Sequence, residues 1–281
     1  MTEHNFFRTG DGKWIYYEIY GSGEPLILIP GHMCTTSFFS RNVEVLAKQY
    51  QVITFDPRGY GRSTKSTQGN TVKRHGRDLH DLMEHLSLKR TTVFAWSLGG
   101  AALMSYIREF GQQRLWAIGL IDAPLAPFSP EPWNSHRTKG YNVDGWLETY
   151  GGWVRNPEAY YQFFANKQFR TPPRAEESRW ITEEVKKTMP WTGLELHLDF
   201  CHQNYIADLE KLEIPVAIFA GVSVNLPKSV DMAREYRKRV KGKSELYIFE
   251  EGGHLPFYVE ADRFNMLVLE FLKEANNKVY G

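Results

Sequence analysis

The stretch of sequence that decides the fold reads Thr91-Thr92-Val93-Phe94-Ala95-Trp96-Ser97-Leu98-Gly99-Gly100. Its first half is rich in β-branched and aromatic residues, as in a buried strand, and residues 101–104 continue as an apolar helical pattern. Ser97 stands between the two, so the pattern predicts a sharp strand-to-helix turn with the serine at its tip. Ala95 and Gly99 supply the small residues that such a turn requires on either side.

A serine in this position is typical of a nucleophile elbow, in which a strained turn holds the hydroxyl above the edge of a sheet. Ala95 replaces the first glycine of the pattern G-x-S-x-G, which is a small departure. Ser97 could also simply cap the following helix, as serine often does. The surrounding sequence has to decide between the two interpretations.

Further runs of strand length flank the elbow on both sides. They lie at residues 13–20, 25–29, 51–55, 115–121, 215–220 and 245–249. Helical spacing of apolar residues predicts a crossover helix over 76–87 and a final helix around 264–272. Strands that are apolar throughout and alternate with helices indicate an α/β fold, with a mostly parallel sheet flanked by helices on both faces.

The character of the chain changes between residues 125 and 205. Proline and tryptophan become frequent, β-branched runs vanish, and aromatic helical patterns such as 157–169 take their place. We therefore predict an inserted helical cap over 125–205, between an N-terminal core part over 1–124 and a C-terminal core part over 206–281.

Composition and spacing argue against several other classes of function. The net charge is +1, so no overall field attracts nucleic acid or an anionic membrane. The start lacks a secretory pattern and no apolar run reaches the ~18 residues of a membrane span, so a soluble, cytoplasmic protein is expected.

Cys34 and Cys201 are expected to be free thiols. His75, His80 and His85 recur every five residues, which separates them around a helix and predicts a solvated face rather than a metal site.

Neither a G-x-x-x-x-G-K-[ST] motif nor a strand followed by G-x-G-x-x-G occurs, which argues against phosphate-binding enzymes. No metal or organic cofactor is expected, and the expected partner is a small-molecule substrate.

Two loops complete the expected chemistry. Residues 30–33 follow an early buried strand, where the backbone N–H of His32 could stabilise an oxyanion together with that of Leu98. The His32 imidazole could line the pocket or point to solvent. His254 follows the last strand and two glycines, which makes it the candidate general base for Ser97 among nine histidines. The alternative is a histidine in a surface turn.

Together these motifs resemble an α/β-hydrolase of the esterase, haloperoxidase and proline iminopeptidase type, over nearly the whole chain. Residues 56–63 match that family's D-x-R-G-x-G-x-S turn, and residues 208–215 resemble its return from cap to core. The resemblance implies a serine hydrolase whose histidine is oriented by an acid.

The acid is where the sequence departs from the family pattern. Val224 occupies the position where the family usually has Asp, and valine cannot orient an imidazole. Asp122, at the end of the strand after the elbow, is the natural replacement, as in certain dehalogenases and lactone hydrolases that the chain resembles. Ser223 or Asn225 could instead hydrogen-bond His254, or the triad could be incomplete.

Trp96 and Leu125 are the candidate pocket-wall residues because they adjoin Ser97 and the strand end at Asp122. Cap tryptophans such as Trp153 and Trp191 could add aromatic lining or form the cap's own core. We expect a carboxylesterase acting on an ester or lactone of a small, apolar acyl compound. The alternatives are amide or peptide cleavage, carbon–carbon hydrolysis or perhydrolysis by the same triad, and a non-enzymatic ligand receptor or signalling protein on this scaffold.

Overall fold

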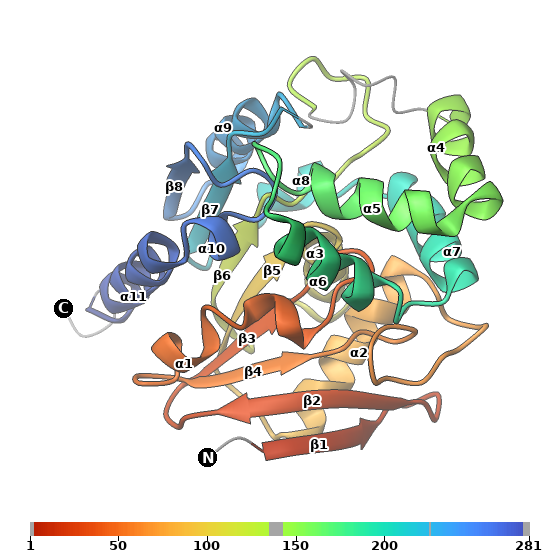
Figure 1. Ribbon diagram of the computed structural model, residues 1–281. Helices are drawn as coiled ribbons and strands as arrows, with labels where there is room; N and C mark the ends of the chain where they lie inside the picture. Colours follow the sequence, from red (N-terminus) through yellow and green to blue (C-terminus); the bar gives the residue numbers. More distant parts are fainter. Residues whose placement is uncertain (1–2, 135–142, 225, 278–281) are drawn as a thin grey trace.

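A computed structural model describes residues 3–134, 143–224 and 226–277 (Figure 1). Its centre is an eight-stranded sheet in the order β1-β2-β4-β3-β5-β6-β7-β8. The strands are β1 Glu3–Arg8, β2 Trp14–Tyr20, β3 Pro25–Ile29, β4 Gln51–Phe55, β5 Thr91–Trp96, β6 Leu115–Ile121, β7 Val216–Gly221 and β8 Ser244–Phe249. The pairs β1–β2 and β2–β4 are antiparallel and all later pairs are parallel, which confirms the predicted mostly parallel sheet.

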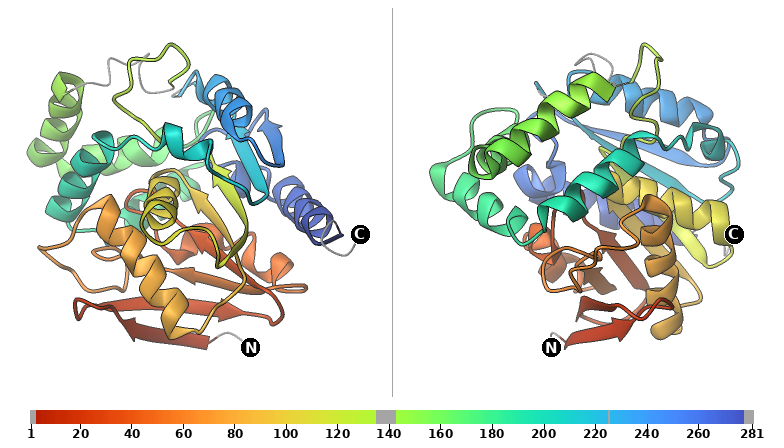
Figure 2. Two further views of the ribbon diagram at one scale, coloured as in Figure 1. Left: turned by 180° about the vertical axis from the view of Figure 1, so that it is seen from behind. Right: turned by 90° about the vertical axis from the view of Figure 1, so that its right-hand side faces the viewer.

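Helices surround this sheet. They are the short 3-10 helix η1 Thr36–Phe39, then α1 Val43–Leu46, α2 Val72–His85, α3 Leu98–Phe110, α4 Val143–Arg155, α5 Pro157–Lys167, α6 Ala175–Val185, α7 Pro190–Cys201, α8 Ile206–Leu209, α9 Ser229–Arg239, α10 Pro256–Val259 and α11 Ala261–Asn277. In the view from behind, α2 and α3 lie side by side in front of the sheet (Figure 2).

Both faces of the central strands are buried, because successive side chains point to opposite sides. In β3, Ile27 and Ile29 belong to one hydrophobic cluster and Leu26 and Leu28 to the other. The first cluster includes buried residues of α2, α3 and α9, and the second includes those of α11. This two-sided burial explains why the strands read as continuous apolar runs in the sequence.

Helices α4–α7 lie between β6 and β7 in the chain and sit over the edge where the parallel strands end (Figure 1). The chain leaves and re-enters the core at adjacent points, since the Tyr205 N–H donates to the Leu125 carbonyl over 2.9 Å. We call α4–α7 the inserted helices. The boundaries predicted at residues 125 and 205 stay predictions.

The structure corrects the sequence analysis at three places. Strand β1 was not predicted. Helix α2 begins at Val72 and not at the predicted residue 76, because the Thr71 side chain caps it by accepting the Arg74 N–H. The predicted solvated face is wrong for His75, which is only 6% exposed. His75 is buried because α2 packs one face against α3 and against the loop that carries Tyr60.

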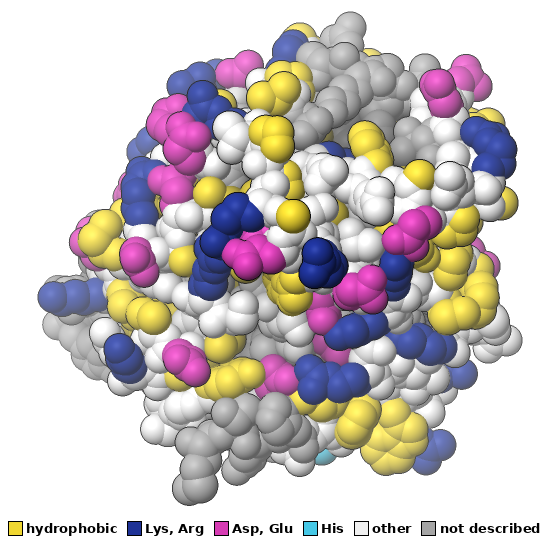
Figure 3. All heavy atoms as spheres, in the orientation of Figure 1, with side chains coloured by type: hydrophobic (Ala, Val, Ile, Leu, Met, Phe, Trp, Pro, Cys, Tyr) yellow, Lys and Arg dark blue, Asp and Glu magenta, His cyan; other side chains and the backbone are white. Residues whose placement is uncertain are grey.

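Basic and acidic side chains alternate across the face shown in Figure 3. Among the described residues, no helix combines the length and apolarity needed to cross a bilayer. Within the same residues, no group of three or more His, Cys, Asp or Glu side chains is arranged to hold a metal ion. Cys34 and Cys201 are buried thiols that take part in no disulfide, in agreement with the sequence analysis.

Candidate active site

Ser97 lies on the turn between β5 and α3 with φ 54° and ψ −124°, a backbone conformation that L residues rarely adopt. Its N–H donates to the carbonyl of Ile121 over 2.9 Å, which ties the turn to β6. A Cβ added at Gly99 would lie 2.7 Å from the Pro30 carbonyl oxygen, so only glycine fits where α3 begins. The Ser97 side chain forms no helix-capping hydrogen bond, which removes the capping interpretation.

The Ser97 hydroxyl instead lies in a continuous chain of hydrogen bonds. Its Oγ is 2.9 Å from His254 Nε2, and His254 Nδ1 is 2.5 Å from Asp122 Oδ2. An ionised Asp122 accepts the Nδ1 proton, so Nε2 is left as an acceptor for the serine hydroxyl. The structure thus brings together all three side chains that the sequence analysis proposed.

The backbone of His254 is held on both sides. Its N–H donates to the Gln168 carbonyl, and its own carbonyl accepts from the Trp96 indole N–H, each over 2.7 Å. Gly253 precedes it with φ 56°, and a Cβ there would lie 2.6 Å from the same Gln168 oxygen. The glycine therefore allows the inserted segment to approach closely enough to bond His254.

Asp122 comes directly after β6. Its N–H donates to the Phe219 carbonyl of β7 over 2.7 Å, and its backbone has φ 41°. Its side chain is fully buried, and Oδ1 has no hydrogen-bond partner among the described residues. The one side-chain hydrogen bond of Asp122 among these residues is therefore that of Oδ2, which is directed at His254.

The alternative acid positions lie elsewhere. Val224 is 71% exposed in the loop after β7. Ser223 Oγ accepts the Leu226 N–H over 3.1 Å, and Asn225 falls outside the described residues. The imidazole nitrogen that these residues were considered to bind is already bonded to Asp122.

The two candidate oxyanion donors lie beside the elbow. Within the described residues, neither the His32 N–H nor the Leu98 N–H has an acceptor. A Cβ added at Gly31 would lie 3.1 Å from Ser97 Cβ, so the loop after β3 rests directly against the nucleophile turn. Their role as oxyanion donors stays a prediction.

The turn after β4 supports this loop. The Asp56 carboxylate accepts the backbone N–H groups of Thr36 and Arg62, each over 2.8 Å. Arg58 is fully buried and pairs with Asp78 over 2.7 Å.

The His32 imidazole is 7% exposed and lies beneath the inserted helices, so it does not point to solvent. Its Nδ1 is 3.2 Å from the Tyr60 hydroxyl, and its ring centroid is 4.8 Å from that of His197. Burial lowers the pKa of His32 to about 3, so the ring is neutral at ordinary pH.

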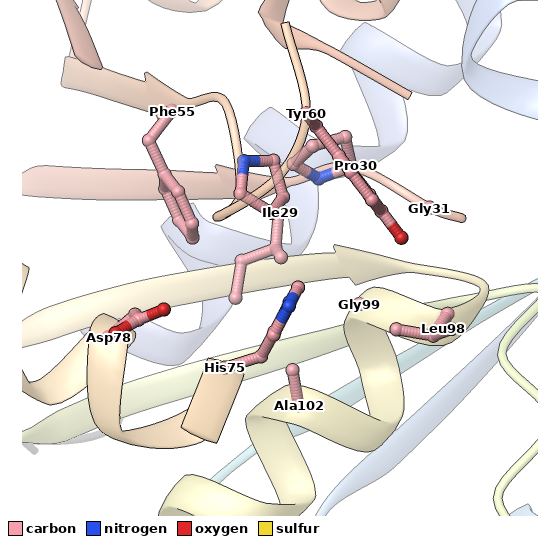
Figure 4. A pocket seen from close by; sticks show the side chains of 11 residues that line it. Ile29, Pro30, Gly31, Phe55, Tyr60, His75, Asp78, Leu98, Gly99 and Ala102 are labelled. Atoms are coloured by element: carbon pink, nitrogen blue, oxygen red, sulfur yellow. The ribbon is translucent and has the colours of Figure 1, made fainter. Parts of the chain in front are cut away.

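Behind the loop after β3 is a small cavity, shown in Figure 4, where Tyr60 lies alongside the Pro30–Gly31 segment. The cavity has room for roughly one water molecule and is too small for a substrate. It is lined by Ile29, Pro30, Gly31, Phe55, Pro57, Tyr60, His75, Asp78, Leu98, Gly99 and Ala102.

Trp96 and Leu125 are both almost completely buried. Trp96 packs beside the His254 ring, and the Leu125 N–H donates to the Tyr236 hydroxyl over 2.8 Å. Their predicted role in the pocket wall stays a prediction. Of the cap tryptophans, Trp153 is buried and Trp191 is 41% exposed.

Comparison with known proteins decides the family. A family model of the alpha/beta hydrolase fold matches residues 24–261. The chain belongs to the α/β-hydrolase fold family. A Synechocystis sp. protein with the provisional name non-heme chloroperoxidase is 28% identical over 272 residues, which cover 92% of this α/β-hydrolase and 95% of that protein.

Solved structures of the same fold superpose closely on this α/β-hydrolase. A bromoperoxidase from Bacillus anthracis has a TM-score of 0.86 at 25% identity, over 96% of this chain and 100% of that one. An esterase from Exiguobacterium antarcticum has the same TM-score at 21% identity and the same coverage, which is a likeness of fold alone.

Proposed function

We propose that this α/β-hydrolase is a serine esterase that cleaves carboxylic esters of small, largely apolar acyl groups. The observation that carries the proposal is the hydrogen-bonded chain from Ser97 Oγ through His254 to the buried Asp122. Nucleophile, base and orienting acid are the three parts that acyl transfer to a serine requires.

In the acylation step, Ser97 Oγ attacks the ester carbonyl carbon while His254 Nε2 takes the hydroxyl proton. The carbonyl π electrons move to the oxygen, where the N–H groups of His32 and Leu98 stabilise the negative charge. The carbon–oxygen bond to the alcohol then breaks, and His254 returns the proton to the departing oxygen. The product is an acyl group esterified to Ser97.

Water completes the cycle by the reverse sequence. His254 removes a proton from the water as its oxygen bonds to the acyl carbon, and then protonates Ser97 Oγ as the acyl–serine bond breaks. Asp122 keeps the imidazole in the required orientation and stabilises the imidazolium in both steps. The carboxylic acid leaves and the free serine is restored.

Aromatic residues of the inserted helices support the choice of a small apolar acyl group. The stacked rings of Trp153 and Tyr160 have centroids 4.7 Å apart, and Phe164 lies against His32. Apolar and aromatic walls with few polar groups are usual in pockets for small organic ligands.

The test is hydrolysis of p-nitrophenyl acetate and butyrate. Ser97→Ala removes the nucleophile and is expected to lower kcat by roughly 10⁴-fold or more. Ser105→Ala, on the same helix α3, is the matched control and should stay within about twofold. Turnover that survives Ser97→Ala would contradict the proposal. Tight ligand binding with no turnover would favour the receptor alternative, and cleavage of amides alone would favour an amidase.

A second reaction of the same acyl-enzyme is favoured by the relatives named chloroperoxidase and bromoperoxidase. Hydrogen peroxide could replace water, so that its oxygen bonds to the acyl carbon, the acyl–serine bond breaks and a peracid leaves. The test is bromination of an indicator in the presence of acetate, peroxide and bromide, because the released peracid oxidises bromide to the hypobromous acid that brominates the indicator. This activity should require Ser97 and should vanish when the carboxylic acid is omitted.

A further inference from the structure

The His32 side chain has a polar atom that the proposed mechanism leaves unused. Nε2 is buried and has no hydrogen-bond partner among the described residues. An unsatisfied buried donor or acceptor is costly, so an atom of this kind needs an explanation. The backbone of the same residue supplies a proposed oxyanion donor, which places the unused atom within one side chain's length of the reaction.

The neighbouring Tyr60 determines which imidazole nitrogen carries the proton. The buried Tyr60 hydroxyl oxygen accepts a hydrogen bond from the backbone of Met33, and it lies 3.2 Å from His32 Nδ1. Among the described residues the buried hydroxyl has no acceptor other than Nδ1, so its proton is directed there, and a neutral imidazole then carries its own proton on Nε2. Because burial keeps the His32 pKa at about 3, this Nε2–H is an uncharged donor.

The surroundings of the ring place this donor between the core and the inserted helices. A Cβ added at Gly193 of α7 would lie 3.6 Å from His32 Cε1, and Phe164 of α5 contacts the ring edge to face. His197, also on α7, is the closest ring. The wall around the donor is therefore mostly aromatic, and Lys167 and His75 are the further charged or titratable groups that act on the ring from nearby.

The sheet order determines which part of an ester would reach His32. Strand β5, which carries Ser97, lies between β3, which precedes His32, and β6, which precedes Asp122. The departing alcohol oxygen must face His254, which is bonded to Asp122 on the β6 side. The carbonyl oxygen would face the His32 N–H on the β3 side, so an acyl chain of a few atoms keeps its own oxygen within reach of the His32 side chain.

We propose that His32 is a specificity-determining residue whose Nε2–H donates a hydrogen bond to an uncharged oxygen in the substrate's acyl chain. The preferred substrates are then esters of short oxygen-bearing acids, with an ether or ketone oxygen a few bonds from the ester carbonyl. This inference rests on the proposed esterase function and adds the class of acyl group.

The experiment compares two esters of equal size, p-nitrophenyl methoxyacetate and p-nitrophenyl butyrate, which differ by one ether oxygen in place of a methylene. The selectivity is the ratio of their kcat/KM values, which cancels any general loss of activity in a variant. His32→Leu is expected to lower this selectivity on the order of tenfold relative to wild type, as expected for one lost hydrogen bond. His32→Gln retains a side-chain N–H donor and should recover part of the loss.

A second variant avoids the oxyanion residue. Tyr60→Phe removes the hydroxyl that directs the proton to Nε2 and should lower the selectivity severalfold, and the ratio of kcat/KM values cancels any general loss that comes from freeing the Met33 N–H. Because the donor is neutral, the wild-type selectivity should also be flat from pH 6 to pH 9, unlike that of a charged donor.

The outcomes separate the two proposals. Equal selectivity in wild type and His32→Leu, with hydrolysis that still depends on Ser97, overturns the role of His32 and leaves the esterase proposal standing. A wild type that hydrolyses neither ester and shows no reactive Ser97 overturns the esterase proposal and this inference with it. A selectivity that titrates between pH 6 and pH 9 overturns the neutral donor.

Discussion

The ends of strands β6 and β7 are neighbours in the sheet, with Ile121 paired to Phe219, yet the two strands lead into different residues. Strand β6 leads into Asp122, which is buried and bonded to His254. Strand β7 leads into the loop with Val224, which is 71% exposed. Two adjacent strand ends can therefore serve one histidine, and an acid missing from one can be supplied by the other.

The backbone explains why the β6 end is suited to the task. The Asp122 N–H is bonded to the Phe219 carbonyl, so the residue that carries the carboxylate is attached to the neighbouring strand. A positive φ turns its side chain toward His254 and away from the usual strand direction. A carboxylate fixed in this way orients the imidazole without reorganising during the reaction.

Among changes at the two strand ends, the largest expected effect is that of Asp122→Asn. The amide keeps the shape of the side chain but cannot stabilise the imidazolium and favours the wrong tautomer of His254. We expect kcat for p-nitrophenyl butyrate to fall by about 10³- to 10⁴-fold. Circular dichroism should show a folded protein.

Adding Val224→Asp to that variant sharpens the comparison between the two strand ends. The side chain at 224 points to solvent, so we expect it to recover less than about tenfold of the lost activity. Asp122→Asn activity within a few fold of wild type would contradict the assignment of the acid to β6.

The next prediction concerns histidines that follow two other strands. His254 after β8 is hydrogen-bonded to Asp122, whereas His32 after β3 is buried. Burial lowers the pKa of His32 to about 3, against about 6.5 in an unfolded chain. Between these values the unfolded state binds the additional proton, so the free energy of unfolding falls as the pH drops from 6.5 toward 3.

His32→Leu should therefore reduce the slope of the free energy of unfolding against pH by up to about 1.4 kcal/mol per pH unit between pH 6 and pH 4. Urea titrations at several pH values measure this slope. Phe164→Leu alters the packing against the same ring without removing a titrating group, so it should leave the slope unchanged. Equal slopes in wild type and His32→Leu would show that the imidazole titrates normally in the folded state.

A smaller effect is expected at the end of β5. Trp96→Phe removes the indole N–H that the His254 carbonyl accepts, while much of the ring packing remains. We expect kcat to fall by roughly three- to tenfold, the equivalent of one neutral hydrogen bond, because the loop that carries His254 is less firmly held. Steady-state kinetics on p-nitrophenyl butyrate measure it, and an unchanged kcat would show that the Gln168 bond alone positions the loop.

The smallest effect is that of Val224→Asp in the otherwise unchanged protein. An exposed carboxylate in the loop after β7 should change kcat by less than about twofold, since His254 already has its acid. A larger increase would mean that the β7 end also reaches the imidazole.

The elbow and the histidine could be predicted because their signals are local. Ser97 stands between a strand and a helix with small residues around it, and His254 comes after the last strand and two glycines. Asp122 could be proposed because neighbouring strand ends meet at one edge of a parallel sheet. Val224 at the family's usual acid position showed that the sequence differs from the family pattern, but it did not indicate which other residue supplies the acid.

The contacts between the core and the inserted helices could not be predicted. The bond from His254 to Gln168 and the ring contact between His32 and His197 join residues far apart in the chain, and no spacing indicates them. The burial of His75 was missed for a similar reason, since it depends on how α2 packs against Tyr60 and α3. Local patterns identified the side chains of the candidate triad, whereas the contacts that support them depend on tertiary packing.

The central claim is that Ser97 is an activated nucleophile, and labelling with a fluorophosphonate tests it most directly. Intact mass and peptide mapping should find one adduct on Ser97 in the wild type, much slower labelling of Asp122→Asn, and none in Ser97→Ala. A folded wild type that forms no adduct, or an adduct elsewhere that persists in Ser97→Ala, would contradict the account.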